Sequence, residues 1–196
     1  MGVRKSLLRL VLGPERSERL NARRTTRRIM RSPDRQALLG AYLPAFAAEG
    51  GRMLWVGCRD YTEDYPQLLE RGGGEAWTTD IDPLAERWGR AGRHRTGDLR
   101  QLDRLFEDVG FDAILCNGVL GWGVDEAEDQ SRALAAMAGR LRPGGRLLLG
   151  WNTDRIEDPL AAGLTAPWYE PGPFAGIETR ARFPGATHVY DLLVRR

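Results

Sequence analysis

The sequence predicts an α/β fold built on a doubly wound, mostly parallel sheet of seven strands that ends in an antiparallel hairpin. Two observations carry this prediction. Short apolar runs alternate with helix-like segments and lie at residues 53–56, 76–79, before Gly97, at 111–116 and at 146–151, which is typical of parallel strands joined by right-handed crossovers. Two further runs, at 178–183 and 187–194, are separated only by Pro184-Gly185-Ala186, a spacing that allows a hairpin but no crossover helix.

The helices between these strands are marked by their ends and their apolar faces. Ser32-Pro33-Asp34 supplies a capping serine, a proline in the first turn and an acid beside it, so a helix begins there. Pro44 should end or kink that helix around Leu43. Residues 101–108 and 126–141 are also expected to be helical, and the Pro- and Gly-rich stretch 159–173 is expected to be a loop or a short helix.

The charge is distributed unevenly along the chain of 196 residues. Its net charge is +2, yet residues 1–35 hold eleven Lys and Arg against three Asp and Glu. We therefore expect a basic N-terminal arm with lid helices at residues 1–31, and a single Rossmann-like domain at residues 32–196.

Composition narrows the setting in which the protein works. No apolar run approaches the roughly 18 residues of a membrane span, and the apolar run near the N-terminus is broken by Arg9, unlike a secretory signal. Two cysteines, Cys58 and Cys116, are too few for a disulfide framework. The expected location is cytoplasmic, with the arm a candidate for peripheral contact with a membrane.

Three interpretations of the basic arm remain open. It is a solvated lid over the main crevice, or it binds an anionic membrane surface or anionic substrate, or it binds nucleic acid. Residues 3–12 have the pattern of a short basic amphipathic helix. Nucleic acid is the least favoured of the three, and the oligomeric state is not indicated.

Acidic residues end two of the predicted strands. Asp80 follows the second strand and Asp98 follows the third. A carboxylate at such a position accepts hydrogen bonds from a ribose diol or an adenine amino group, so these residues predict a nucleotide crevice. Each has a simpler alternative: Asp80 forms a turn, and Asp98 caps the helix that begins at Leu99. Asn117-Gly118, after the fourth strand, is either a turn or a ligand contact.

Local motifs across residues 32–196 resemble those of the class I S-adenosylmethionine-dependent methyltransferases. They are VGC at 56–58, TTDID at 78–82, GDL at 97–99, FDAILCNGVLGW at 111–122 and LRPGGRLLLGW at 141–151. The resemblance implies S-adenosylmethionine as the cofactor, with Asp80 on the ribose, Ile81 against the adenine and Asp98 facing the adenine amino group. The cofactor-binding residues that it implies are Gly57, Cys58, Arg59, Asp80, Ile81, Asp98, Leu99, Asn117 and Gly118.

The first motif departs from the family pattern at three positions. Trp55 stands where the family has an acid, and Arg59 and Tyr61 stand where it has glycines. Glycines there let the backbone approach the ligand closely, so their loss predicts a differently shaped loop. Arg59 and Asp60 are candidates for contact with the methionine end of the cofactor, and a narrowed or inactive pocket is the alternative.

Other residues have both functional and structural interpretations. Cys58 and Cys116 are expected to be small buried residues, and the isolated His94 and His188 are more often structural than catalytic. Trp122, Trp151, Trp168 and Tyr169 are candidates for the walls of a substrate site, although core packing explains them equally. No residue spacing suggests a metal site, and no catalytic residue is identified.

The expected function is transfer of a methyl group to an oxygen or nitrogen of a small molecule or glycan-type intermediate. Such a transfer needs mainly orientation, so the lack of a catalytic dyad is no objection. The alternative is a non-catalytic module that keeps the fold for binding or regulation. A nicotinamide-dependent oxidoreductase is disfavoured because no G-x-G-x-x-G follows the first strand.

Overall fold

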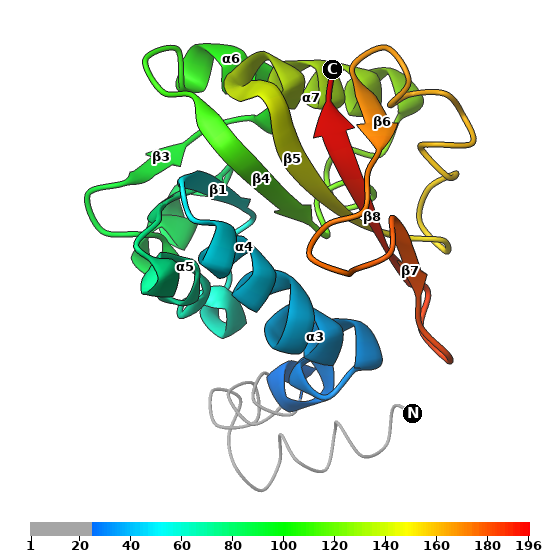
Figure 1. Cartoon of the computed structure of the whole chain (residues 1–196), viewed down its shortest axis with the longest axis horizontal. Coiled ribbons are helices and arrows are strands. Elements are labelled where there is room, and N and C mark those ends of the chain that lie inside the picture. Colours follow the sequence, from blue (N-terminus) through cyan, green and yellow to red (C-terminus); the bar gives the residue numbers. More distant parts are fainter. Residues whose placement is uncertain (1–24) are drawn as a thin grey trace, which may run out of the picture.

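A computed structural model describes residues 25–196 and shows one eight-stranded sheet between two layers of helices (Figure 1). The strand order is β3-β2-β1-β4-β5-β8-β6, with β7 also paired to β8. The strands are β1 (Arg52–Val56), β2 (Glu75–Asp80), β3 (His94–Thr96), β4 (Phe111–Asn117), β5 (Leu141–Asn152), β6 (Tyr169–Pro171), β7 (Arg180–Arg182) and β8 (His188–Arg195). The predicted α/β class and doubly wound order are confirmed.

The first five strands are parallel, and β1 lies at their centre. It pairs with β2 on one side and β4 on the other, so the carboxyl ends of all three strands meet at one edge of the sheet. Alternate residues of β1 face opposite helical layers: Met53 and Trp55 pack into one core, and Leu54 and Val56 into the other. Burial on both faces explains why this strand reads as a continuous apolar run.

The antiparallel end of the sheet differs from the prediction by one strand. The hairpin of β7 and β8 is present, but β8 also pairs with β6, which comes from the stretch expected to be a loop or short helix. The seven-stranded prediction was therefore one strand short. β6 and β7 are both three residues long and share the outer edge of β8, and Pro171 is tolerated in β6 because an edge strand needs no full hydrogen-bond ladder.

The helix that begins at Pro33 runs through Pro44 instead of ending there. It consists of α3 (Pro33–Ala37), a π-helical turn η1 (Leu38–Tyr42) and α4 (Leu43–Glu49). Pro44 has no N–H and would crowd the carbonyl one turn earlier in a regular helix. The wider turn relieves this conflict, with the Leu43 N–H donating to the Leu38 carbonyl, and this is why the predicted end or kink near Leu43 was wrong.

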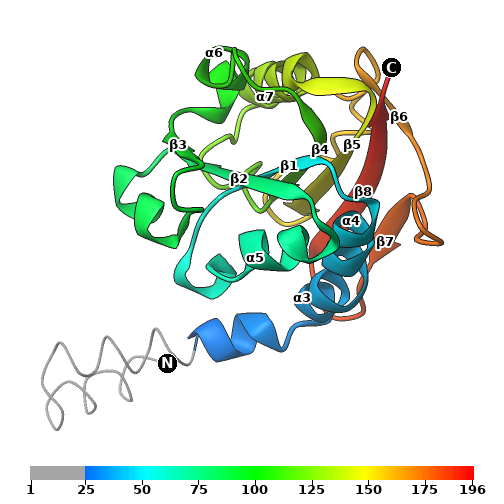
Figure 2. The ribbon, with the colours of Figure 1, turned by 60° about the vertical axis from the view of Figure 1, so that its left-hand side comes forward.

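Besides a helical stretch at residues 25–30, the remaining helices are short except for one. They are η2 (Asp60–Thr62), α5 (Tyr65–Leu69), η3 (Glu70–Gly72), η4 (Pro83–Trp88), η5 (Leu99–Gln101), α6 (Leu102–Leu105) and α7 (Ala127–Arg140). As Figure 2 shows, α3, α4 and α5 cover one face of the sheet, and α6 and α7 cover the other. No helix in residues 25–196 is long and apolar enough to cross a membrane.

Candidate functional site

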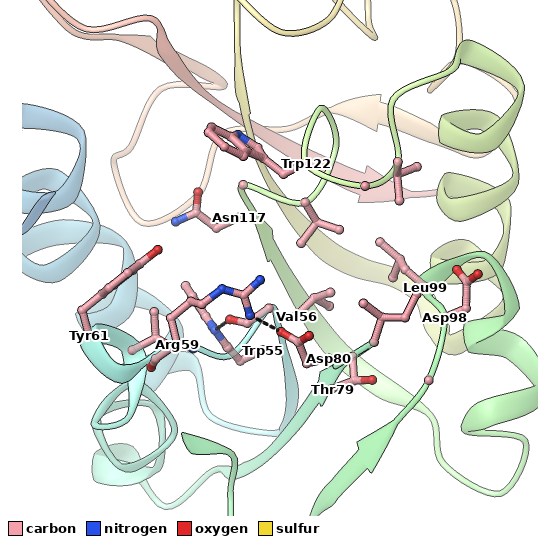
Figure 3. Close-up of a pocket in the computed structure, with 18 of the residues that line it drawn as sticks. Trp55, Val56, Arg59, Tyr61, Thr79, Asp80, Asp98, Leu99, Asn117 and Trp122 are labelled. Carbon is pink, nitrogen blue, oxygen red and sulfur yellow. Dashed lines mark hydrogen bonds and ion pairs between the residues drawn. The ribbon is translucent and has the colours of Figure 1, made fainter. Parts of the chain in front are cut away.

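A pocket lies at the carboxyl edge of the parallel strands (Figure 3). Its cavity volume is about 120 Å³. The segments that follow β1, β2, β3 and β4 all contribute to its wall, and one residue of α3 joins them. Its lining includes Arg35, Trp55, Gly57, Arg59, Tyr61, Thr79, Asp80, Ile81, Asp98, Leu99, Asn117, Gly118, Val119 and Trp122.

Asp80 occupies the centre of this edge, at the end of β2, and its carboxylate is almost fully buried. Its Oδ2 accepts the backbone N–H of Cys58 at 2.8 Å and the Arg59 Nη1 at 2.7 Å. Its Oδ1 accepts only the Asp82 N–H, at 2.9 Å. A carboxylate has about four lone-pair sites, so one position on Oδ1 remains free for a ligand hydroxyl.

Arg59 is the side chain that distinguishes this pocket from one with a glycine-rich loop. Its guanidinium forms an ion pair with Asp80 at 2.7 Å, drawn as a dashed line in Figure 3, and its side chain is half exposed. The Arg59 N–H donates to the Thr62 hydroxyl at 2.9 Å, which fixes the turn into η2. The cation therefore stands beside the acid that sequence reasoning assigns to a ribose.

Trp55 takes the place of an acid inside β1 and is fully buried. Its indole N–H donates to the Gly57 carbonyl at 2.6 Å, and its ring meets the Tyr65 ring edge-on at 5.0 Å. Gly57 adopts a φ of +90°, which only glycine reaches without strain. Trp55 thus holds the shape of the loop by packing and by one hydrogen bond.

Asp98 lies at the end of the pocket away from Arg59, with its carboxylate turned away from Asp80 in Figure 3. Its Oδ1 accepts the Arg100 N–H at 2.9 Å and so caps η5. The Arg100 guanidinium bonds both carboxylate oxygens, and this lowers the pKa of Asp98. The capping alternative is what the structure shows, while contact with an adenine stays a prediction.

Asn117 and Trp122 close the side of the pocket opposite Asp80 in Figure 3. Asn117 ends β4, and its Nδ2 lies 3.3 Å from the Tyr190 hydroxyl. Trp122 is more than half exposed, and the Arg155 guanidinium stacks 3.9 Å from the centre of its ring. This side of the pocket is aromatic, polar and partly open.

Comparison with known proteins identifies this arrangement. Residues 54–149 match a family model described as a methyltransferase domain. Those residues contain the last three residues of β1, all of β2, β3 and β4, and every strand-end segment of the pocket. The chain carries a methyltransferase domain with the fold of the class I S-adenosylmethionine-dependent methyltransferases. None of the curated sequences compared matches it.

Solved structures support the methyltransferase fold. A TehB-like methyltransferase from Corynebacterium glutamicum is 19% identical and covers 82% of this chain and 92% of its own, with a TM-score of 0.60. The N-methyltransferase NodS from Bradyrhizobium japonicum, in complex with S-adenosyl-L-homocysteine, is 15% identical over 86% and 90%, with a TM-score of 0.63. A third methyltransferase, from Archaeoglobus fulgidus, is 12% identical over 82% and 92%, with a TM-score of 0.56.

The structure brings the residues implied by the resemblance into this one pocket, with one exception. Gly57, Arg59, Asp80, Ile81, Asp98, Leu99, Asn117 and Gly118 all line it. Cys58 does not, because its thiol is fully buried. It acts through its backbone N–H on Asp80.

Three other expectations concern residues away from the cofactor pocket. Cys58 and Cys116 are buried and unbridged, and burial raises the pKa of each thiol to about 12. Trp151 and Tyr169 belong to the hydrophobic core and do not line the pocket. His94 bonds the Thr78 hydroxyl at 2.9 Å in the sheet. The structural interpretation holds for these five residues.

Sequence reasoning missed Arg35 altogether. It follows the helix start at Ser32-Pro33 and looks like one more cation of the basic arm, yet it is buried and lines the pocket. Nothing local in the sequence separates it from its exposed neighbours. Only the packing of α3 against the strand ends reveals its place.

The pocket fits S-adenosylmethionine with one rearrangement. Asp80 offers a buried carboxylate with a free lone-pair position for the ribose, and the exposed Ile81 offers an apolar surface for the adenine. For the second ribose hydroxyl to reach Oδ2 of Asp80, the Arg59 guanidinium must move. Since the Arg59 side chain is half exposed, it has room to do so.

Proposed function

We propose that this methyltransferase transfers a methyl group to a nitrogen or oxygen of a small molecule or glycan-type intermediate bound between Asn117 and Trp122. The observation that carries the proposal is the division of the pocket into two sides. Acidic strand ends suited to a nucleoside lie on one side, and an open aromatic and polar wall lies on the other. The second side leaves room for an acceptor.

In this mechanism the protein acts mainly by holding and orienting. When bound, S-adenosylmethionine supplies an electrophilic methyl group on a sulfonium. Asp80 and Ile81 fix the nucleoside, and Asn117 and Trp122 position the acceptor and limit the access of water. Alignment of two reactants in this way supplies much of the rate enhancement of a methyl transfer.

The alternative is a non-catalytic module, and one observation favours it. The Arg59–Asp80 ion pair already satisfies part of the carboxylate that a ribose would need. If the pair does not open, the fold is kept for another role.

For the basic arm we propose contact with an anionic membrane surface or an anionic substrate, because residues 1–35 hold eleven Lys and Arg against three Asp and Glu, whereas acidic residues outnumber basic ones in the rest of the chain. Residues 1–24 lie outside the described part of the chain. The expected outcome is binding to vesicles that contain anionic lipid, weakened by salt and lost when residues 1–24 are deleted.

Release of S-adenosylhomocysteine in the presence of candidate acceptors tests the proposed function. The candidates are amines, alcohols and glycan intermediates, each with and without an anionic group. We expect turnover with at least one class, and its loss in Asp80→Asn. Binding of the cofactor without turnover of any class would favour the non-catalytic module.

A further inference from the structure

Three buried side-chain polar atoms in residues 25–196 lack a hydrogen-bond partner: Arg35 Nε, Asn117 Oδ1 and His188 Nε2. They come from α3, β4 and β8, and the atoms of Asn117 and His188 lie near Tyr190. The Tyr190 hydroxyl lies 3.3 Å from Asn117 Nδ2, and its ring lies 4.7 Å from the His188 ring. Burial raises the pKa of Tyr190 and lowers the pKa of His188, and the positive charge of Arg35 acts to lower both.

The hydrogen bonds of His188 define what its unpaired nitrogen offers. Its Nδ1 lies 3.1 Å from the Asn152 Oδ1, and the Asn152 amide is oriented by a bond from its Nδ2 to the Thr187 hydroxyl. The proton is therefore assigned to Nδ1, and Nε2 presents a lone pair. Burial lowers the pKa of His188 to about 4, with Arg35 acting in the same sense and Asp34 opposing it, so the ring is neutral at pH 7.

Asn117 Oδ1 and His188 Nε2 lie beside the same backbone position. A Cβ added to Gly150 would meet both atoms at less than 3.0 Å. Both atoms are hydrogen-bond acceptors, so a ligand that pairs with them must supply hydrogen-bond donors. One amino group carries two hydrogens and serves both, whereas a hydroxyl carries one and would leave an acceptor unpaired.

Arg35 presents the opposite requirement. Its side chain is permanently charged, the residue is only 9% exposed, and no carboxylate of residues 25–196 lies within ion-pair distance of it. Its neighbours are the Tyr61 ring at 5.3 Å and the Tyr65 hydroxyl at 3.4 Å from Nη1. A buried cation without a counter-ion is costly, and Arg35 lines the pocket, so an anionic ligand group would complete it.

We propose that Arg35, Asn117 and His188 form the acceptor subsite, and that the acceptor is a small anionic amine. Its carboxylate or phosphate binds Arg35, and its amino group donates one hydrogen to Asn117 Oδ1 and one to His188 Nε2. The proposal rests on the proposed function and narrows it to methylation of nitrogen.

The chemistry of this subsite balances without a catalytic base. The amine reacts in its neutral form, with its extra proton left in water, because only that form has a nitrogen lone pair, and the charge of Arg35 favours it over the ammonium. The nitrogen lone pair then forms the bond to the methyl carbon while the carbon–sulfur bond breaks, and that electron pair stays on sulfur. The product nitrogen carries the positive charge that leaves the sulfur.

The two histidines of the chain make the test direct. The imidazole Cε1–H signals of His188 and His94 are followed by NMR in full-length protein saturated with S-adenosylhomocysteine. Glycine, β-alanine and O-phosphoethanolamine are the probes, and glycolate and ethanolamine are the controls that lack the amine or the anion. We expect each probe to shift the His188 signal in a saturable way and to leave the His94 signal unchanged. The controls should bind roughly tenfold more weakly than the probes. Comparison of the affinities for β-alanine and O-phosphoethanolamine shows whether the site prefers a carboxylate or a phosphate.

A set of variants ties the response to Arg35. Arg35→Gln should abolish the His188 response, Arg35→Lys should restore part of it, and Arg142→Gln, at the opposite end of the sheet, should leave it unchanged. Thermal unfolding of each variant checks that it is folded. A full response in folded Arg35→Gln would overturn the proposal.

Two further outcomes would overturn it. In the first, S-adenosylhomocysteine shifts the His188 signal, 5′-methylthioadenosine does not, and no probe adds a further shift. That result would show that Arg35, Asn117 and His188 bind the amino-acid end of the cofactor. In the second, no ligand shifts the His188 signal, which would show that the space between these three residues holds only water. A His188 response to the probes in protein that does not bind S-adenosylhomocysteine would support the amine site and defeat the proposed function.

Discussion

Arg59 is the residue that decides how readily the pocket accepts its cofactor. It replaces a glycine of the family pattern and holds the Asp80 carboxylate in a partly exposed ion pair. Such a pair is worth up to about 1 kcal/mol, and the ligand must displace it. Arg59→Ala is therefore expected to tighten S-adenosylhomocysteine binding roughly fivefold in calorimetry. Weaker binding in this variant would show that Arg59 is a ligand to the cofactor instead.

His188 gives the molecule a pH-dependent stability. Its pKa is lowered to about 4 in the folded state, mainly by burial, against about 6.5 in the unfolded chain. Protonation below pH 6.5 thus favours unfolding. The free energy of unfolding should fall by up to roughly 3 kcal/mol between pH 6.5 and 4, measured by urea denaturation. His188→Gln should flatten this part of the profile, and an unchanged profile would contradict the assignment.

At the scale of elements, one ion network ties β8 to its neighbours. Asp191 in β8 is fully buried and accepts hydrogen bonds from Trp151 of β5 and Arg180 of β7. Arg180 also forms a two-fold ion pair with Asp158, in the segment before β6. The network joins the antiparallel edge to the core of the sheet.

Removal of Arg180 would leave the buried Asp191 without its cation. Arg180→Ala should lower the free energy of unfolding by about 3–5 kcal/mol, measured by urea denaturation at pH 7. Arg182→Ala is the matched control, because Arg182 is mostly exposed and lies 3.7 Å from Asp158; its cost should stay below about 1 kcal/mol. Equal losses in the two variants would contradict this role of the network.

The sequence predicts some elements well and others poorly, for physical reasons. Strands buried on both faces, such as β1 and β4, show continuous apolar runs, and α7 shows a clear apolar face. β6 was missed because its stability comes from pairing with the distant β8, and Pro171 gives it a loop-like composition. The π-helical turn before Pro44 was missed because its benefit depends on keeping α4 packed against the sheet.

At the scale of the whole molecule, some residues of the site could be predicted from the sequence and others could not. Asp80 and Asp98 could be placed in one crevice because the ends of parallel strands meet at one edge. Arg35 could not, since it reaches the pocket only through the packing of α3 against the strand ends. The proposed role of His188 depends in the same way on the antiparallel return of β8. The half of the site that follows strand order was predictable, and the half built by long-range packing was not.

Calorimetric titration with S-adenosylhomocysteine, for the wild type and Asp80→Asn, tests the central claim most directly. We expect micromolar binding to the wild type. We expect it to be at least about tenfold weaker in Asp80→Asn, which keeps the shape of the side chain but loses its charge as a ribose acceptor. A folded wild-type protein that binds no S-adenosylhomocysteine, or an Asp80→Asn variant that binds it equally well, would contradict the account.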